Sequence, residues 1–259
     1  MTATAVGRGA RQRVRPAPPF PAQHPWDRNF FLALVALTWL GVLMGFVPQM
    51  IQHVTQHQRP YPLAVHVHAA AFVTWLVLLT AQVLLVRTRR LALHRKLGYG
   101  MVALGAVMLV VGPTAVWVVQ QQDFGTPKSN PAFLSVQGTA MISFLVVGGA
   151  AVLLRKSPSA HKRLMIIATL VLADAGFARW LGHPIRAAFG KGMWQSYLAL
   201  SGATALIIVG MGVYDLITRR RLLPAYAAGA SWALAGQALA AWLMFVPAWK
   251  VLATHLLGH

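Results

Sequence analysis

The chain alternates long apolar runs with short polar segments whose charges are mostly basic. Each run has roughly the 20 residues that a helix needs to cross a bilayer core about 30 Å thick. A backbone in lipid must satisfy its own hydrogen bonds, and the runs lack the alternating polarity of barrel strands, so helices are predicted. The runs are residues 30–47, 63–86, 99–120, 133–154, 164–182, 198–218 and 227–248. The pattern predicts an all-α polytopic membrane protein with seven transmembrane helices.

The basic residues predict the orientation of these helices. Most of the 23 Lys and Arg residues precede the first span or lie between spans two and three, four and five, or six and seven. Because Lys and Arg accumulate in cytoplasmic loops, the N-terminus is predicted in the cytoplasm and the C-terminus outside. Residues 1–28, rich in Arg and Pro, are predicted as a disordered cytoplasmic tail, and residues 29–259 as the transmembrane domain. The expected location is the inner (plasma) membrane of a bacterium.

The amino-acid composition limits which class of protein and which kinds of site the chain can form. The chain is 57% hydrophobic and 10% charged, whereas a soluble domain has about 25% charged residues. The net charge of +19 lies in short segments between spans, so the lipid bilayer, and no nucleic acid, is the expected partner. The absence of Cys excludes disulfides, iron–sulfur clusters and thiolate metal sites. The chain has four acidic residues, all Asp, which leaves few carboxylates for a paired-carboxylate mechanism. The sequence does not predict an oligomeric state.

The segments before the third and fifth spans are nearly identical. They contain HRKL at 94–97 and HKRL at 161–164, and each follows a span that runs inward and precedes one that runs outward. Two hairpins of the same orientation predict a parallel internal repeat, related by an axis along the membrane normal. A third hairpin, around 219–221, has a basic turn without histidine. The predicted architecture is one leading helix plus three hairpins.

Histidines are the first candidates for a cofactor site. Histidine is costly inside a membrane and is the usual axial ligand of haem. The topology places His94 and His161 at the cytoplasmic interface, and His66 and His68 near the outer one. His66 shares its helix face with small residues that leave room for a macrocycle, whereas His68 shares its face with aromatic residues. His66 is therefore favoured as the buried ligand, and His68 is the substitute ligand. Alternatively, both bond to loop backbone or water, and the inner pair begins helices whose Arg and Lys neighbours bind lipid phosphates.

His53 and His57 are a second, smaller candidate. Their i, i+4 spacing would place both rings on one face if the segment were helical, which suits a divalent metal. The competing interpretation is a solvated polar loop, because no carboxylate lies nearby.

Asp174 lies near the middle of the fifth predicted span. A carboxylate at that depth must be paired, protonated or face a polar cavity. It is either a proton-relay group or a hydrogen-bonding partner of Gln137, Thr139 or Ser143 on the preceding helix. Arg179 lies on the same helix but about 140° round it, which makes it a poor partner.

Three further polar or helix-breaking features have structural interpretations. Asp215 and Arg219, four residues apart, predict an ion pair at an inner helix end. Asp27 is predicted to cap the first helix. Gly112 and Pro113 predict a kink in the third.

The segments 66–69 (HVHA), 94–98 (HRKLG) and 161–165 (HKRLM) resemble a family of uncharacterised bacterial multi-pass inner-membrane proteins over nearly the whole chain after the tail. That family implies a polytopic fold but no activity. The HRxLG piece alone is similar to haem-binding motifs of the cytochrome b561 and haem A synthase groups, which would imply haem b. The chain lacks the glutamate that precedes the histidine in haem A synthase, and the mid-helix histidine pairs of a two-haem b561 protein.

The leading hypothesis is therefore a haem-binding or other redox-type membrane protein. His66 or His68 would be its outer ligand, His94 and His161 its inner pair, and a quinone or another membrane redox partner would exchange electrons with the cofactor. The alternatives are a proton-coupled transporter using Asp174, and an accessory subunit of a membrane complex whose histidines are structural. Enzyme activity stays undecided.

Overall fold

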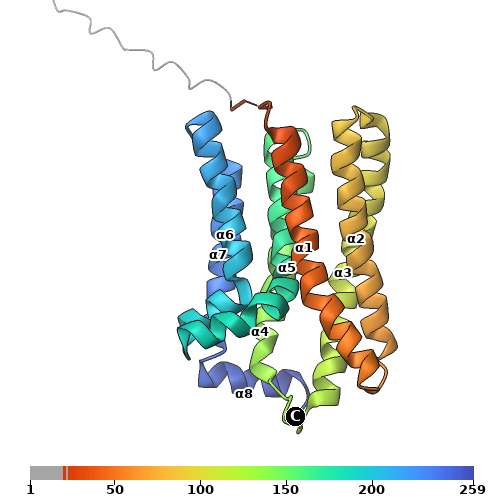
Figure 1. The fold of residues 1–259 in the computed structure, drawn as a ribbon, viewed down its shortest axis with the longest axis vertical. Coiled ribbons are helices and arrows are strands. Elements are labelled where there is room, and N and C mark those ends of the chain that lie inside the picture. The colour runs from red at the N-terminus through yellow and green to blue at the C-terminus, as the bar shows by residue number, and fades with distance from the viewer. Residues whose placement is uncertain (1–19, 22) are drawn as a thin grey trace, which may run out of the picture.

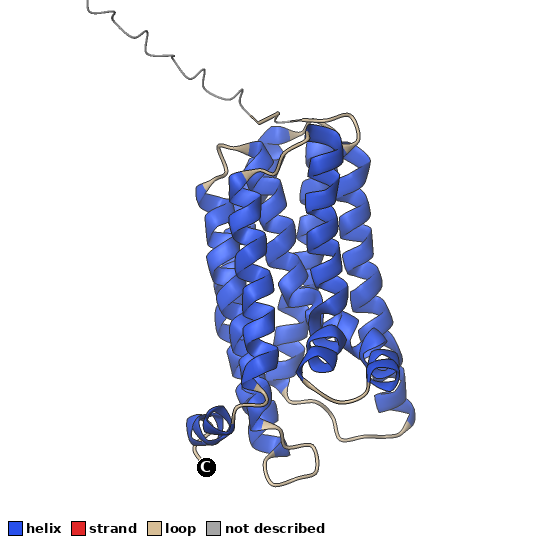
Figure 2. Cartoon of the chain, turned by 90° about the vertical axis from the view of Figure 1, so that its left-hand side faces the viewer, coloured by secondary structure: helices blue, strands red, loops and turns tan. Residues whose placement is uncertain are grey.

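The computed structural model describes residues 20–21 and 23–259, so most of the predicted tail, residues 1–28, lies outside the described residues. The regular structure of the described part is entirely helical (Figures 1 and 2). Its elements are α1 (Asp27–Thr55), α2 (Leu63–Arg87), α3 (Leu91–Asp123), the short 3-10 helix η1 (Pro131–Phe133), α4 (Leu134–Leu153), α5 (Pro158–Phe189), α6 (Met193–Arg219), α7 (Pro224–Leu243) and α8 (Pro247–Leu256).

The helices are long and apolar enough for a polytopic membrane protein. By length and composition, six described helices, α1 to α6, can cross a membrane, and α7 with α8 makes a seventh if the bent pair is one span. The predicted all-α fold is thus confirmed. The long helices stand side by side; α1 begins at one end of the bundle and the C-terminus lies at the other (Figure 1). We call these the inner and outer ends, following the predicted orientation, which stays a prediction.

The last predicted span, 227–248, is not one straight helix. α7 ends at Leu243 and α8 begins at Pro247, and the two axes meet at 93°. Proline lacks the amide hydrogen and disfavours helical backbone in the residue before it, and Val246 is indeed extended, with φ −83° and ψ 116°. α8 therefore lies across the outer end of the bundle (Figure 1).

The helices of the third and fifth predicted spans begin earlier than predicted, within the segments that carry the two histidine motifs. α3 begins at Leu91 and α5 at Pro158, so His94 and His161 lie on helices. α3 also continues through Gly112 and Pro113, and the kink predicted there stays a prediction. The hairpins α2–α3 and α4–α5 are both present, while the repeat that would relate them remains a prediction.

α5 is the central helix of the bundle and packs against α1, α4, α6 and α7. Its crossing with α1 is close because glycines line it: Gly41 and Gly45 of α1 face Gly176 of α5. A β-carbon on Gly176 would lie 2.8 Å from the Gly41 carbonyl oxygen. Glycines four residues apart are the usual means by which membrane helices approach closely, since they let the backbones touch.

Candidate functional site

A network of charges at the inner end joins α5 to α6. Arg163 donates from Nε to Asp215 Oδ2 at 2.7 Å and from Nη2 to Oδ1 at 2.5 Å. The side chains are 1% and 0% exposed, so this bidentate pair is fully buried. Arg219 adds the predicted i, i+4 contact to Asp215 at 3.3 Å. Arg163, in the segment expected to bind lipid phosphates, is thus bonded inside the protein instead.

Asp27 belongs to the same network and does not cap α1, which has no side-chain cap. Its carboxylate accepts hydrogen bonds from Lys162 at 2.5 Å, from Tyr214 at 2.6 Å and from Arg219 at 2.8 Å. The prediction of a simple cap was wrong because the partners are brought in from α5 and α6. Each of the three cations Lys162, Arg163 and Arg219 contacts one or both of the two carboxylates, so the inner network ties α1, α5 and α6 together.

Two of the predicted ligands, His94 and His161, approach each other beside this network. Their ring centroids are 6.4 Å apart and the ring planes are nearly perpendicular. His161 Nδ1 lies 2.8 Å from the Ala151 carbonyl oxygen. Because a carbonyl only accepts, Nδ1 carries the hydrogen and the neutral ring keeps its lone pair on Nε2. His94 Nδ1 is buried and has no hydrogen-bond partner among the described residues.

The other two predicted ligands lie at the outer end, so the four histidines do not form one site. His66, favoured as the buried ligand, is exposed, and its Nδ1 lies 3.1 Å from the Pro62 carbonyl oxygen. His68 is half-buried; its ring packs 4.1 Å from that of Phe72, and its Nδ1 has no partner in the described part of the chain. The face of α2 that points into the protein therefore carries His68, Phe72 and the buried Trp75. The sequence pattern favoured His66 as the buried histidine, and that prediction was wrong.

The predicted metal pair His53 and His57 is not on one helix face. α1 ends at Thr55, and His57 adopts a left-handed conformation with φ 50°. His53 Nδ1 lies 3.0 Å from Gln58 Oε1. Among the described residues, no group of three or more His, Cys, Asp or Glu is placed to hold a metal ion.

Asp174 has a buried site of its own at the junction of α5, α6 and α7. Ser201 donates to its Oδ2 at 2.9 Å, Gln237 Nε2 donates to the same oxygen at 2.9 Å, and Thr204 donates to Oδ1. The four ion pairs found among the described residues use Asp27 and Asp215, so Asp174 has no cationic partner there. Its partners come from α6 and α7, whereas one of the two interpretations from the sequence placed them on α4, at Gln137, Thr139 or Ser143.

A small cavity borders the Asp174 carboxylate. Its volume is about 10 Å³, and its polar lining comes from Thr139 and Ser143 of α4, with Ser201 and Gln237. That volume is close to what one water molecule requires. Gln237 Oε1 is buried without a hydrogen-bond partner among the described residues, so an acceptor is left free beside the cavity.

Arg179 is held away from Asp174, as expected from its place on the helix. Its Nε donates to Gln49 Oε1 and its Nη1 to the Ala175 carbonyl oxygen, both at 2.8 Å. The guanidinium carbon lies 4.5 Å from the centre of the Phe46 ring.

No protein-family model, curated protein or solved structure matches this chain. The resemblance drawn from the histidine motifs therefore stays a prediction, and the functional argument rests on the chain's own geometry.

The partners of Asp174 on α6 and α7 were not predicted from the sequence. Ser201 and Thr204 have an i, i+3 spacing on one face of α6, which was a usable signal. Gln237 is a lone amide in an apolar helix, and only tertiary packing brings it to the carboxylate.

Proposed function

We propose that this integral membrane protein is a proton-coupled permease in which Asp174 binds the proton. The observation that supports the proposal is a buried carboxylate at a three-helix junction, bonded to hydroxyl and amide groups rather than to a cation. An ionised carboxylate is costly in a membrane. Hydroxyl groups can both donate and accept, so Ser201 and Thr204 suit the ionised and the protonated carboxyl.

The cavity provides the second requirement of proton binding. A protonated carboxyl needs an acceptor, and Gln237 Oε1 is an unpartnered one in the same site. A single water in the cavity can bridge the protonated carboxyl to Gln237 Oε1 by hydrogen bonds, while the proton stays on Asp174. Because the donors lie on α6 and α7 and the carboxylate on α5, gain or loss of the proton changes the bonds that join these helices. That change is the link between proton binding and helix movement that a permease needs.

Replacing Asp174 by Asn tests the proposal. Asn keeps the shape of Asp but has one acceptor oxygen and one NH2 donor where Asp has two oxygens, and it cannot bind the proton. Gln237 can turn its amide so that its unpartnered Oε1 accepts from the new NH2, so Asp174→Asn should fold with an unchanged circular dichroism spectrum and lose pH-gradient-driven solute uptake in proteoliposomes. Infrared spectra should show a carboxyl band that titrates in the wild type and is missing in the variant. Asp123→Asn, at the outer end of α3, is the control and should behave like the wild type. Full uptake by Asp174→Asn, or no titrating band in the wild type, would reject the proposal.

A redox cofactor, haem b in particular, is the second candidate, and the approach of His94 to His161 favours it. A ligating histidine donates its other ring N–H to a carbonyl or carboxylate, which is the arrangement of His161 with Ala151. His94 has a buried nitrogen without a partner among the described residues, so the two rings fit a two-nitrogen donor set. Haem bound there would supply one-electron chemistry, with a quinone or another membrane redox partner.

The absorption spectrum of the purified protein tests this second candidate. Haem at the inner pair predicts a Soret band that His161→Ala abolishes and that His57→Ala, in the outer loop, leaves unchanged. A protein without a Soret band after expression with added haem precursor would remove this candidate, and a band unaffected by His161→Ala would exclude the inner pair.

A further inference from the structure

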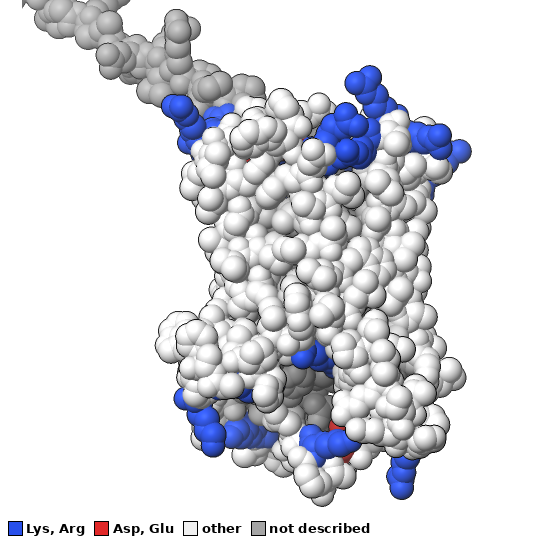
Figure 3. All heavy atoms as spheres, in the orientation of Figure 1, with Lys and Arg blue, Asp and Glu red and all other residues white. Residues whose placement is uncertain are grey.

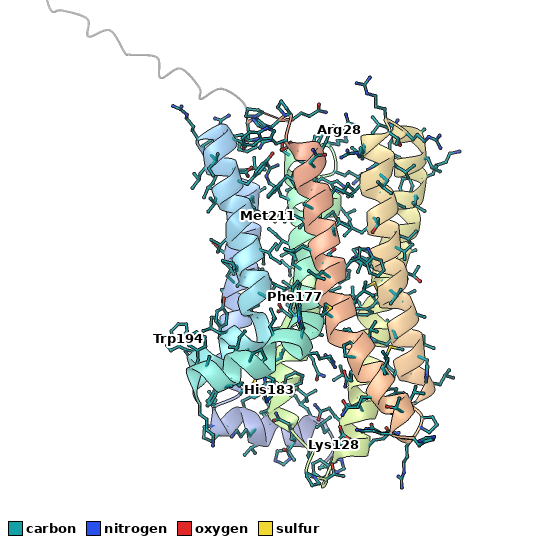
Figure 4. All side chains as sticks on the ribbon, viewed as in Figure 1. Arg28, Lys128, Phe177, His183, Trp194 and Met211 are labelled. Carbon is teal, nitrogen blue, oxygen red and sulfur yellow. The ribbon has the colours of Figure 1, made fainter. Side chains whose placement is uncertain are left out.

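A hollow opens near the outer end of the molecule, with basic side chains at its edge (Figure 3). It lies on the side where α5, between Phe177 and His183, approaches the outer end (Figure 4). Neither the Asp174 site nor the inner histidine pair includes this region.

Arg179 presents free donors in this part of α5. A guanidinium has five N–H groups, of which Nε is used by Gln49 and one Nη1 hydrogen by Ala175. No described residue accepts from Nη2, and Arg179 is exposed. The Nη1–Nη2 end of the fork is therefore free to bind two oxygens of one ligand, as arginine does with carboxylates and phosphates.

The side chain is also held in place. Gln49 fixes the Nε edge and the Phe46 ring lies 4.5 Å under the guanidinium carbon, both from α1. Flanking contacts that fix an arginine lower the entropy lost when it binds a ligand. The residues that hold Arg179 come from α1, and α2 is joined to α5 by the hydrogen bond from Trp75 to Thr169.

The surroundings carry positive charge that the protein does not neutralise there. Arg179 forms no ion pair with any described residue. An unpaired charge within a membrane-spanning helix is by default a functional group. The other basic residues of the outer side are Arg59, Lys128, Arg186, Lys191 and Lys250, whereas Asp123 is its one acidic residue. Such an excess attracts anions and raises their local concentration.

We propose that Arg179 is the anchor of an oxyanion-binding site at the outer end, which takes a carboxylate or phosphate group through two oxygens. Gln49 and Phe46 position the guanidinium, and the unpartnered Nδ1 of His68 is a second polar group on the neighbouring helix. The oxyanion belongs either to a free solute or to a lipid headgroup. The site stands independently of proton binding at Asp174, because no contact joins the two groups among the described residues.

Binding to purified full-length protein in neutral detergent tests the proposal. Benzoate and inorganic phosphate are titrated by calorimetry, and retention of phosphatidylglycerol after purification is measured by mass spectrometry. Arg179→Gln removes the free fork and should weaken binding of the retained anion about tenfold or more. Arg59→Gln removes one positive charge from the same side and should leave affinity unchanged. Asp174→Asn should also leave it unchanged, which separates this site from the proposed permease function.

The three binding measurements distinguish a solute site, a lipid-headgroup site and the absence of a site. Saturable benzoate or phosphate binding that Arg179→Gln weakens supports a solute site, and selective loss of phosphatidylglycerol in that variant supports a headgroup as the source. Equal weakening by Arg59→Gln would show a diffuse charge effect and overturn the site. Absence of binding by all three probes to the wild type would overturn it as well.

Discussion

At the scale of single residues, the charged groups divide into two kinds. The inner pair Arg163 and Asp215 is fully buried and bidentate, so each charge compensates the other. Asp174 is also buried but is bonded only to neutral groups. The Arg163–Asp215 pair is suited to holding helices together, whereas the Asp174 carboxyl is suited to binding and releasing a proton.

Removing one member of the inner pair should be strongly destabilising. Asp215→Asn leaves the Arg163 guanidinium buried without its counter-charge, and such changes cost about 3–5 kcal/mol. The double variant Arg163→Met with Asp215→Leu removes both charges and should recover much of that loss. Thermal unfolding in detergent, followed by circular dichroism, measures both, with Arg59→Gln as an exposed control. A double variant no more stable than Asp215→Asn would contradict this account.

Residue types and spacing predicted part of the candidate site. Asp174 stood out because a carboxylate in an apolar span needs an explanation, and the Asp215–Arg219 pair followed from its helical spacing. The stronger Arg163–Asp215 bond joins two residues that are 52 positions apart in the sequence, and no local pattern encodes such a contact. His66 was preferred over His68 because small neighbours suggested room for a cofactor, but small neighbours equally suit a face that packs against nothing.

At the scale of elements, the close crossing of α1 and α5 depends on three glycines. A side chain at Gly45 would overlap the Gly176 backbone itself, which cannot rotate away as a flexible side chain could. The crossing therefore positions the helix that carries Asp174, His161 and Arg179.

Gly45→Ala should separate the two helices and destabilise the protein by about 1–3 kcal/mol, as overpacking typically does. Gly149→Ala on α4 is the matched control, because a β-carbon there meets no atom within 4 Å, and replacing a helix glycine by alanine stabilises by about 0.5–1 kcal/mol. Melting temperatures of both variants in one detergent decide the question: a Gly45→Ala protein as stable as Gly149→Ala would show that the helices can move apart without loss.

The element boundaries show where hydropathy is informative. It located the transmembrane cores because apolar length decides them. It placed the beginnings of α3 and α5 too late, since it counted basic first turns as loop. It also extended the last span through Pro247, where backbone sterics rather than polarity end the helix.

At the scale of the whole molecule, the described chain begins and ends at opposite ends of one helical bundle (Figures 1 and 2). The chain has no Cys, so single cysteines report topology directly. Lys128→Cys and Lys191→Cys, at the outer end, should react with a membrane-impermeant maleimide in intact cells. Lys156→Cys and Arg90→Cys, at the inner end, should react only after permeabilisation. The opposite labelling pattern would reverse the predicted orientation.

The aromatic contact at the inner end has a consequence for the behaviour of the protein in different buffers. The Phe20 ring lies over Arg163, Arg219 and Arg221, at 5.2, 5.4 and 5.5 Å. The arginines of these ion pairs, Arg163 and Arg219, are each 1% exposed at the side chain. Mobile ions weaken exposed pairs far more than buried ones. Raising ionic strength should therefore leave the junction of α1, α5 and α6 intact, and a chain shortened past Phe20 would gain a salt sensitivity that the full chain lacks.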